Sequence, residues 1–174
     1  MTFRKMEVSG IAEKINPISM IQDNWYLVTA EDNGTANTLT AAWGGLGNVC
    51  GKSAATVYIR PQRYTKKFMD ASGRFTMTFF DFDKYQPALM YLGSHSGADD
   101  PDKIEHAGLH LTHVEGEPAC EEGKYVLVCR TFFRQPMDPA NFIDPKDAEA
   151  NYPDKDYSVI YIAEIVAAYE QVSE

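Results

Sequence analysis

Hydrophobic and polar residues alternate along much of this chain with the period of two that is typical of β-strands. The clearest case is RFTMTFF, residues 74–80, where Phe75, Met77 and Phe79 share one face and threonines occupy the other. This pattern predicts a half-buried strand. Five further β-branched or aromatic-rich segments are bounded by turn residues, so we expect strands at 25–31, 37–43, 54–60, 125–133 and 158–170.

Helical segments are short and fall between the predicted strands. One ends at Gly73, a residue suited to the left-handed position after a helix. A second places Pro87 in a first helical turn, and a third has Asp102 as its N-cap and Gly108 as its stop. Four prolines interrupt residues 135–157, which predicts a loop with short helical turns, either a lid or a dimer arm.

Six or more strands with few short helices predict a mainly β protein, a β-barrel or related fold with helices over its openings. A doubly wound α/β sheet would need longer helices after most strands. The 174 residues are expected to form one domain, 1–174, which is long enough to bury a core without disulfides or a metal.

Charge and composition narrow the function. The net charge of −9 argues against nucleic-acid binding, and an anionic ligand would need a local basic pocket. The three cysteines show no CxxC spacing, no apolar run approaches membrane-span length, and the N-terminus lacks an apolar leader segment. We therefore expect a cytoplasmic protein that binds neither membrane nor nucleic acid.

A glycine-rich run, GLGNVC at 45–50, follows the predicted strand at 37–43 and nearly matches a dinucleotide-binding fingerprint. Cys50 replaces the third glycine, and a strand follows where the fingerprint requires a helix. The dinucleotide interpretation therefore fails. A flexible turn between adjacent strands is expected instead, with glycines that let a ligand approach the backbone.

Cations and hydroxyls gather around this run. A phosphate monoester needs neutralising charge and hydrogen-bond donors, and the helix predicted after Tyr64 could add its N-terminus. A lysine at a helix start, Lys103, is electrostatically unfavourable unless an anion lies there. The alternative is that these charges are solvated. The residues concerned are Lys52, Arg60, Arg63 and Lys103, with hydroxyls on Thr38, Thr40, Tyr64, Thr65, Ser94 and Ser96.

Other chemistry finds little support in the sequence. His106, His110 and His113 would share a face of one helix, but Gly108 and the strand-like LHLTHV argue against that helix, so no metal site is expected. No nucleophile elbow or acid–base pair is apparent. The chemistry is therefore expected to be pure binding or to be carried by a cofactor, and no side chain is assigned as catalytic.

Several segments together resemble the flavin reductase-like, FMN-binding split-barrel proteins, specifically the flavoredoxin-like branch. They are NTLTAAWGG, ATVYIRPQRYT, FTMTFF, ALMYLGSHSGADDPDK, VLVCR, PMDPANFIDP and DYSVIYIAEIV, which spread over most of residues 25–166. The resemblance implies a split β-barrel with short flanking helices. It also implies a homodimer with one FMN per subunit near the dimer interface.

The same resemblance assigns the binding residues. Asn37, Thr38, Leu39 and Thr40 would lie along the flavin ring and ribityl chain, with Ala42 and Trp43 closing that side. Cys50, in the glycine-rich run, could touch the ligand. The phosphate end would be held by Lys52, Arg60, Tyr64 and Thr65 and, from a second loop, by Ser94, Ser96 and Lys103. Leu39 replaces a common methionine, residues 48–51 replace a bulkier loop, and Leu92 replaces a frequent cysteine.

The function implied is an FMN-dependent oxidoreductase. NADH or NADPH would reduce the flavin, and electrons would pass to a free flavin, a partner protein or a small acceptor that the sequence does not name. One alternative is a non-catalytic FMN carrier for electron transfer or flavin storage, without a nicotinamide site. Another is a barrel that binds a different phosphorylated cofactor or haem.

Overall fold

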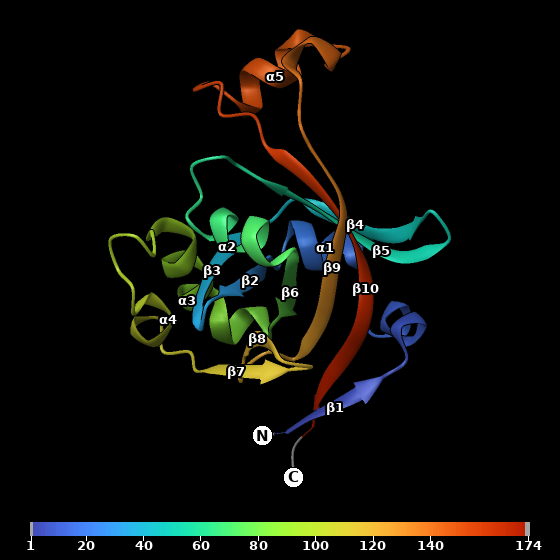
Figure 1. Ribbon diagram of the computed structural model, residues 1–174, viewed down its shortest axis with the longest axis vertical. Helices are drawn as coiled ribbons and strands as arrows, with labels where there is room; N and C mark the ends of the chain where they lie inside the picture. Colours follow the sequence, from blue (N-terminus) through green and yellow to red (C-terminus); the bar gives the residue numbers. More distant parts are fainter. Residues whose placement is uncertain (1, 173–174) are drawn as a thin grey trace.

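One long strand, β10 (Val159–Val172), organises the sheet of this computed structural model, which describes residues 2–172. It pairs antiparallel with β9 (Tyr125–Pro136) along one edge. Along its other edge it pairs first with β5 (Lys52–Ile59) and then with β1 (Thr2–Met6). Two register shifts interrupt the β9–β10 pairing: one leaves Phe132 of β9 without a partner residue, and the other leaves Val166 of β10 without one. Bulges of this kind bend paired strands, and Figure 1 shows that β9 and β10 curve along their length.

The sheet curls into a barrel that does not close. Within residues 2–172 the strand order is β3 (Thr35–Ala41), β2 (Tyr26–Asp32), β6 (Arg74–Phe79), β9, β10, β5 and β4 (Gly44–Val49). The end strands β3 and β4 are joined by only two residues, which span at most ~11 Å between the strand termini. The ends of the sheet must therefore approach each other, and they do so without pairing. The mainly β, split-barrel fold expected from the sequence is confirmed.

Short helices and hairpins cover this barrel, and a projecting segment extends beyond it (Figure 1). They are η1 (Val8–Glu13), α1 (Pro17–Gln22), α2 (Thr65–Ser72), α3 (Phe82–Ser94), α4 (Lys103–His106), and the hairpin of β7 (Leu111–Val114) and β8 (Glu117–Cys120). Residues 137–158, which we call the arm, carry η2 (Pro139–Asn141) and α5 (Pro145–Asn151) between β9 and β10. No helix in the described part of the chain is long and apolar enough to cross a bilayer.

The six predicted strands are present, but three local interpretations were wrong. The glycine-rich run is strand β4, and the turn lies at Cys50 and Gly51, whose positive φ values of 54° and 73° suit a tight hairpin. Helix α3 begins at Phe82, so Pro87 lies inside the helix and not in its first turn. Strand β6 is buried on both faces.

The double burial of β6 arises because the β7–β8 hairpin covers the face that the threonines occupy. Phe75, Met77 and Phe79 pack in the main core, and Thr76 and Thr78 are fully buried behind them. The Thr76 hydroxyl donates to the Pro118 carbonyl at 2.6 Å. Alternation therefore predicted the strand correctly but not the layer that covers its polar face, because that layer comes from residues forty positions away.

The β3–β4 connection is fixed by a buried tyrosine. Tyr26 is fully buried in the core, and its hydroxyl donates to the Trp43 carbonyl at 2.7 Å. Gly44 lies against the same group: a Cβ there would be 2.5 Å from the Thr56 carbonyl oxygen and 2.9 Å from the Tyr26 hydroxyl. The chain can make this turn only because residue 44 has no side chain.

We predict that Gly44→Ala costs about 1–3 kcal/mol of unfolding free energy, because the added methyl must displace backbone of β5. Gly45→Ala is the matched control, since a Cβ there meets nothing within 4 Å, and it should change the unfolding free energy by less than about 0.5 kcal/mol. Urea unfolding of both variants measures the difference. Equal stabilities would contradict the packing described here.

Candidate functional site

A hollow of about 210 Å³ opens where β3 and β5 end, and we call it the β3 hollow. Its wall is apolar along β3 and aromatic at Trp43 and Tyr58, and guanidinium groups lie at its rim. Trp43 is 41% exposed, which is unusual for so large an apolar ring and leaves one ring face available to a ligand. The lining residues are Leu39, Thr40, Ala41, Ala42, Trp43, Tyr58, Ile59, Arg60, Arg63 and Ser158.

A second hollow of about 190 Å³, the α2 hollow, adjoins the first. Leu39 and Arg63 line both, so the two form one continuous groove. Both hollows have polar as well as apolar lining, but only the first contains the aromatic rings of Trp43 and Tyr58. The remaining lining of the second comes from the start of α2, from the end of α3 with the loop that follows it, and from Lys103. That lining consists of Gln62, Tyr64, Thr65, Gly93, Ser94, His95, Ser96, Gly97 and Lys103.

Arg63 is the notable charge of this groove. Its side chain is half-buried, and no carboxylate pairs with it anywhere in residues 2–172. Burial, and secondarily the charge of Arg60, lower the pKa of Arg63 from its ordinary value. A half-buried cation without a counter-ion makes the folding free energy less favourable, and it attracts an anion. Its position between the hollows indicates where that anion would lie.

The start of α2 adds further donors to the α2 hollow. Tyr64 occupies the N-cap position without a side-chain hydrogen bond to the first turn, so the helix is not capped by its own sequence. Thr65 is buried, and its hydroxyl donates to the Asn37 side-chain oxygen at 2.9 Å. The N–H groups of Lys66 and Lys67 already donate to the carbonyls of Arg63 and Tyr64, at 3.0 and 3.3 Å, so the start of α2 contributes to the hollow through its lining residues Tyr64 and Thr65.

Lys103 forms the floor of the α2 hollow. It is 2% exposed, and its ammonium group donates to the carbonyls of His95 at 2.8 Å and Leu92 at 3.3 Å. These bonds hold the loop after α3 against α4. Burial lowers the pKa of Lys103 to about 8, and the charge of Arg63 adds to this effect. An anion in the hollow would relieve the repulsion between these two cations.

Arg60 lies at the opposite end of the groove from the place expected for it. Its guanidinium donates to both carboxylate oxygens of Asp156, at 2.6 and 2.7 Å, and to the Asn151 carbonyl at 2.8 Å. It also lies over the rings of Trp43 and Tyr152, 5.8 and 5.0 Å from their centroids. Its charge is therefore already compensated within the chain, beside the apolar end of the groove.

Lys52 and Cys50 lie away from both hollows, in the β4–β5 hairpin. Cys50 is exposed at the turn, and Lys52 forms an ion pair with Glu164 at 3.0 Å. Within one chain the fold does not bring either residue to the groove, so their ligand contacts stay predictions. Thr38 is also directed elsewhere: it is buried and hydrogen-bonded to Thr29 and to the Val28 carbonyl.

Asn37 supports the groove without lining it. Its amide oxygen accepts from Thr65, and its amide nitrogen fills the space beside Gly97, where a Cβ would approach to 1.8 Å. Sequence reasoning counted Arg63 among the nearby cations but did not assign it to the site, and it missed Tyr58 and Ser158. Of the predicted residues, the groove brings together Leu39, Thr40, Ala42, Trp43, Arg60, Tyr64, Thr65, Ser94, Ser96 and Lys103.

Neither the histidines nor the buried thiols add reactive chemistry to the groove. His106, His110 and His113 pair with separate carboxylates, those of Asp100, Glu122 and Glu31, at 2.9, 2.6 and 2.8 Å. Burial raises the pKa of both the Cys120 and Cys129 thiols, so these groups stay protonated and unreactive.

Solved structures with the same fold include a domain named as FMN-binding and two flavoredoxins. A flavin reductase-like FMN-binding domain from Shewanella baltica OS155 aligns over 97% of this chain and 77% of its own, with a TM-score of 0.69 and 20% identity. Flavoredoxins from Methanosarcina acetivorans and Desulfovibrio vulgaris (Miyazaki F) align over 85% and 86% of this chain and 68% and 69% of theirs. Their TM-scores are 0.67 and 0.64 and their identities 19% and 22%.

At these identities the comparison establishes the fold. No family model and no curated protein sequence matches the chain. The chain therefore has the split-barrel fold of FMN-binding flavin reductase-like domains and flavoredoxins, and the resemblance predicted from sequence is confirmed at that level.

The shifted pKa of Lys103 predicts a pH-dependent stability. Between about pH 8 and the ordinary lysine pKa, the unfolded chain binds more protons than the folded one, so stability rises with pH. Lys103→Met removes this effect. The stability of the wild type relative to the variant should therefore rise by up to ~1.4 kcal/mol per pH unit above pH 8 and stay constant below pH 7.

Urea unfolding of both proteins from pH 7 to pH 10 measures this difference. Lys146→Met, a change at an exposed lysine on α5, is the control and should give a difference that does not vary with pH. A pH-independent difference for Lys103→Met as well would show that the Lys103 ammonium keeps its ordinary pKa.

Proposed function

We propose that the groove binds FMN, with the flavin ring in the β3 hollow and the phosphate in the α2 hollow. The observation that carries this proposal is Arg63, a half-buried cation without a carboxylate partner in residues 2–172, placed where the hollow that contains Trp43 and Tyr58 meets the hollow at the start of α2. FMN has a flat ring at one end and a dianionic phosphate at the other, which correspond to the two hollows. The names of the structural neighbours support the same ligand.

The residues present fit each part of that ligand. Leu39 and Trp43 offer apolar and aromatic contact to the ring, and backbone amides of residues 41–45 are candidate donors to its polar edge. Arg63 and Lys103 offer charge to the phosphate, with hydroxyls of Ser94 and Ser96 beside them. Tyr64 and Thr65 at the start of α2 also line this end of the groove.

The function that follows is that of an FMN-dependent oxidoreductase. Bound FMN would supply the hydride and electron chemistry, so this function requires no catalytic side chain in the groove. The protein's own residues would position the ring, hydrogen-bond its polar edge and exclude water from one face. NADH or NADPH is the expected reductant.

A second candidate function, an FMN carrier without a nicotinamide site, is favoured by one observation. A nicotinamide dinucleotide needs cations for its pyrophosphate, yet Arg60, beside the ring end, is neutralised by Asp156. Arg63 lines both hollows, and in the proposed arrangement its charge is taken up by the FMN phosphate. The carrier would exchange electrons with a partner protein and not with a nicotinamide.

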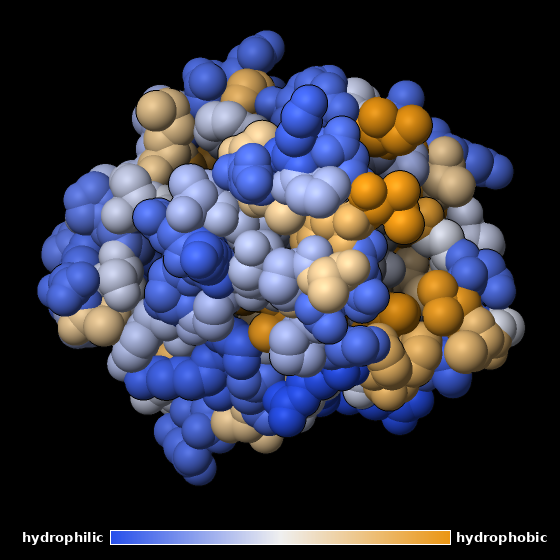
Figure 2. Space-filling model, turned by 90° about the horizontal axis from the view of Figure 1, so that it is seen from above, coloured by the Kyte–Doolittle hydropathy of each residue, from blue (hydrophilic) through white to orange (hydrophobic). Residues whose placement is uncertain are grey.

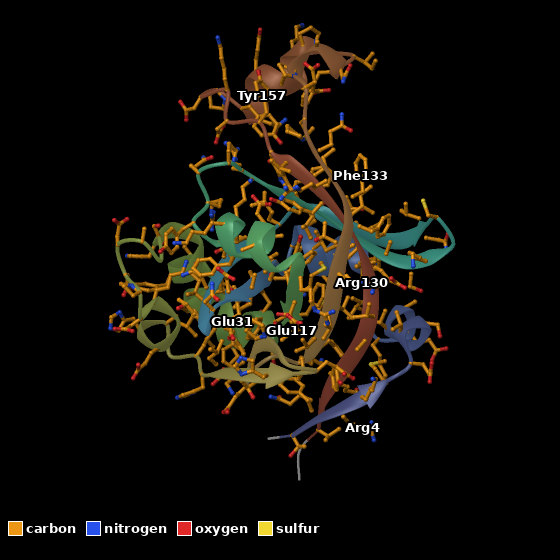
Figure 3. All side chains as sticks on the ribbon, viewed as in Figure 1. Arg4, Glu31, Glu117, Arg130, Phe133 and Tyr157 are labelled. Carbon is orange, nitrogen blue, oxygen red and sulfur yellow. The ribbon has the colours of Figure 1, made fainter. Side chains whose placement is uncertain are left out.

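We also propose that the chain acts as a single-domain homodimer in the cytoplasm. Figure 2 shows apolar side chains gathered on one side of the face that carries the arm. Phe132 and Phe133 are 40% and 45% exposed near the arm end of β9 (Figure 3), and Val166 is 37% exposed on β10. A partner covering this region would bury those side chains. The free thiols Cys50, Cys120 and Cys129 suit a reducing compartment.

The phosphate assignment predicts how FMN and riboflavin affinities diverge. Arg63→Ala should weaken FMN by about 10- to 100-fold, the value of one charge-assisted hydrogen bond, and should affect riboflavin far less. Flavin fluorescence titration of both ligands measures the two affinities. Lys52→Ala is the comparison, because in one chain Lys52 lies away from the groove.

Equal losses of FMN and riboflavin affinity in Arg63→Ala would show that Arg63 does not hold the phosphate. A selective loss of FMN in Lys52→Ala would show that another subunit brings the hairpin to this site.

The oxidoreductase and carrier proposals predict different results when the protein is titrated with NADH or NADPH. Purified protein should be yellow, with the absorbance of oxidised flavin, and NADH or NADPH should bleach it under anaerobic conditions. Dithionite serves as the control that the bound flavin is reducible. Bleaching by dithionite but by neither nicotinamide would leave the carrier as the function, and colourless protein that takes up no added FMN would exclude both.

A further inference from the structure

A third hollow, of about 280 Å³, lies between the arm and the barrel, and we call it the arm hollow. Its lining is nearly all apolar and aromatic, in contrast to the α2 hollow. Trp43 and Tyr58 contribute from the barrel, and the arm supplies the rest. The lining residues are Trp43, Tyr58, Met137, Phe142, Asn151 and Tyr152.

The aromatic rings of this hollow are held in place by one another. Tyr152 meets Trp43 edge to face, with centroids 5.8 Å apart, and also contacts Phe142 at 6.2 Å. The Tyr152 hydroxyl is hydrogen-bonded to Ser158 at 3.1 Å, so the ring is anchored at both ends. Tyr157, on the arm in Figure 3, packs behind it at 5.1 Å. Such rings suit a flat aromatic guest.

The lining of the arm hollow disfavours a charged ligand. No cation or carboxylate lines it within the described part of the chain. The nearest charge, Arg60, is bound to Asp156 and to the Asn151 carbonyl. An anionic ligand would therefore lose hydration without gaining a partner, and the overall charge of −9 would oppose it as well.

The arm hollow is continuous with the β3 hollow, because Trp43 and Tyr58 line both. A ligand in the arm hollow would thus share a wall with the place proposed for the flavin ring. This arrangement suits a reaction partner better than a second copy of the cofactor, whose phosphate would find no cation there.

We propose that the arm hollow binds a neutral, planar aromatic molecule, which is the small electron acceptor of this protein. Reduced FMN would be oxidised by two electrons, and the bound molecule would be reduced by taking up those electrons as a hydride, together with one proton from solvent. Its role as a reaction partner rests on the proposed FMN function. The binding site itself rests on the arm, on Tyr58 of β5 and on Trp43, and it does not require bound FMN, so the two parts can fail separately.

Binding is tested by calorimetric titration of the full chain with 2-naphthol, before and after loading with FMN. Two matched compounds accompany it: 2-naphthoate, which has the same rings with a negative charge, and decahydro-2-naphthol, which is not planar. Titrations in moderate salt screen the net charge of the protein. We expect 2-naphthol to bind both forms at least tenfold tighter than either matched compound.

Two single substitutions test whether the ligand binds in the arm hollow. Phe142→Ala should weaken 2-naphthol about tenfold, the upper value of one aromatic contact. Ile143→Ala is the control, because the Ile143 side chain, next to Phe142 in sequence, is fully exposed and does not line the hollow. This variant should leave the affinity for 2-naphthol unchanged. The melting temperatures of both variants should match that of the wild type, since neither residue belongs to the core.

Three outcomes would overturn the proposed site, and a fourth would remove only its role as the site of a reaction partner. Absence of 2-naphthol binding, or equal binding of 2-naphthoate, would exclude a neutral aromatic site. Unchanged affinity in Phe142→Ala would place the ligand elsewhere. Loss of 2-naphthol binding on FMN loading would show that the flavin itself fills the arm hollow. Failure of FMN to bind while 2-naphthol still binds would remove the proposed function and leave the aromatic site standing.

Discussion

The bend of β10 is the constraint on which the rest of the structure depends. A straight strand of fourteen residues could hydrogen-bond only to neighbours in one surface, yet β10 serves β9, β5 and β1 in turn. The bulges in its pairing with β9 make this possible and turn the sheet far enough that β3 and β4 approach each other. The gap left between those ends is where the chain crosses at Trp43, and the β3 and arm hollows open there.

The electrostatics of the groove follow from local burial and not from overall charge. The chain carries a net charge of −9, yet Arg63 and Lys103 line one hollow, and within residues 2–172 neither forms an ion pair with a carboxylate. Burial lowers the pKa of both groups; the charge of Arg60 lowers the pKa of Arg63 further, and the charge of Arg63 lowers that of Lys103. Folding therefore leaves uncompensated positive charge at one place, and an anion bound there recovers part of that free energy.

Much of the fold could be predicted from sequence because its signals are local. Alternation marked the six strands, and Gly73 marked the end of α2, where it adopts a φ of 65°. Burial of the Thr76 face could not be predicted, because the covering hairpin is distant in the chain. The glycine-rich run also misled, since β4 forms through pairing with β5 and not through its own propensity.

Sequence predicted some residues of the candidate site correctly and misplaced others, for a related reason. Residue type identified which side chains could hold a phosphate, but only three-dimensional pairing shows which of them are free to do so. Arg60 and Arg63 are three positions apart and equivalent in the sequence. The arm supplies Asp156 to Arg60, whereas nothing in residues 2–172 supplies a carboxylate to Arg63. The difference depends on a residue almost a hundred positions downstream.

The same pairing gives the groove its direction. Asp156 neutralises the end beside Trp43, and the unpaired Arg63 leaves the end beside α2 positive. A ligand with one flat end and one anionic end would therefore be favoured with its charge toward Arg63 and Lys103 and its flat end toward Trp43 and Tyr58. Asp156 belongs to the arm, and the aromatic residues of the arm extend the lining beyond Trp43. Under the proposed function, the arm would thus act both on the orientation of the cofactor and on the choice of reaction partner.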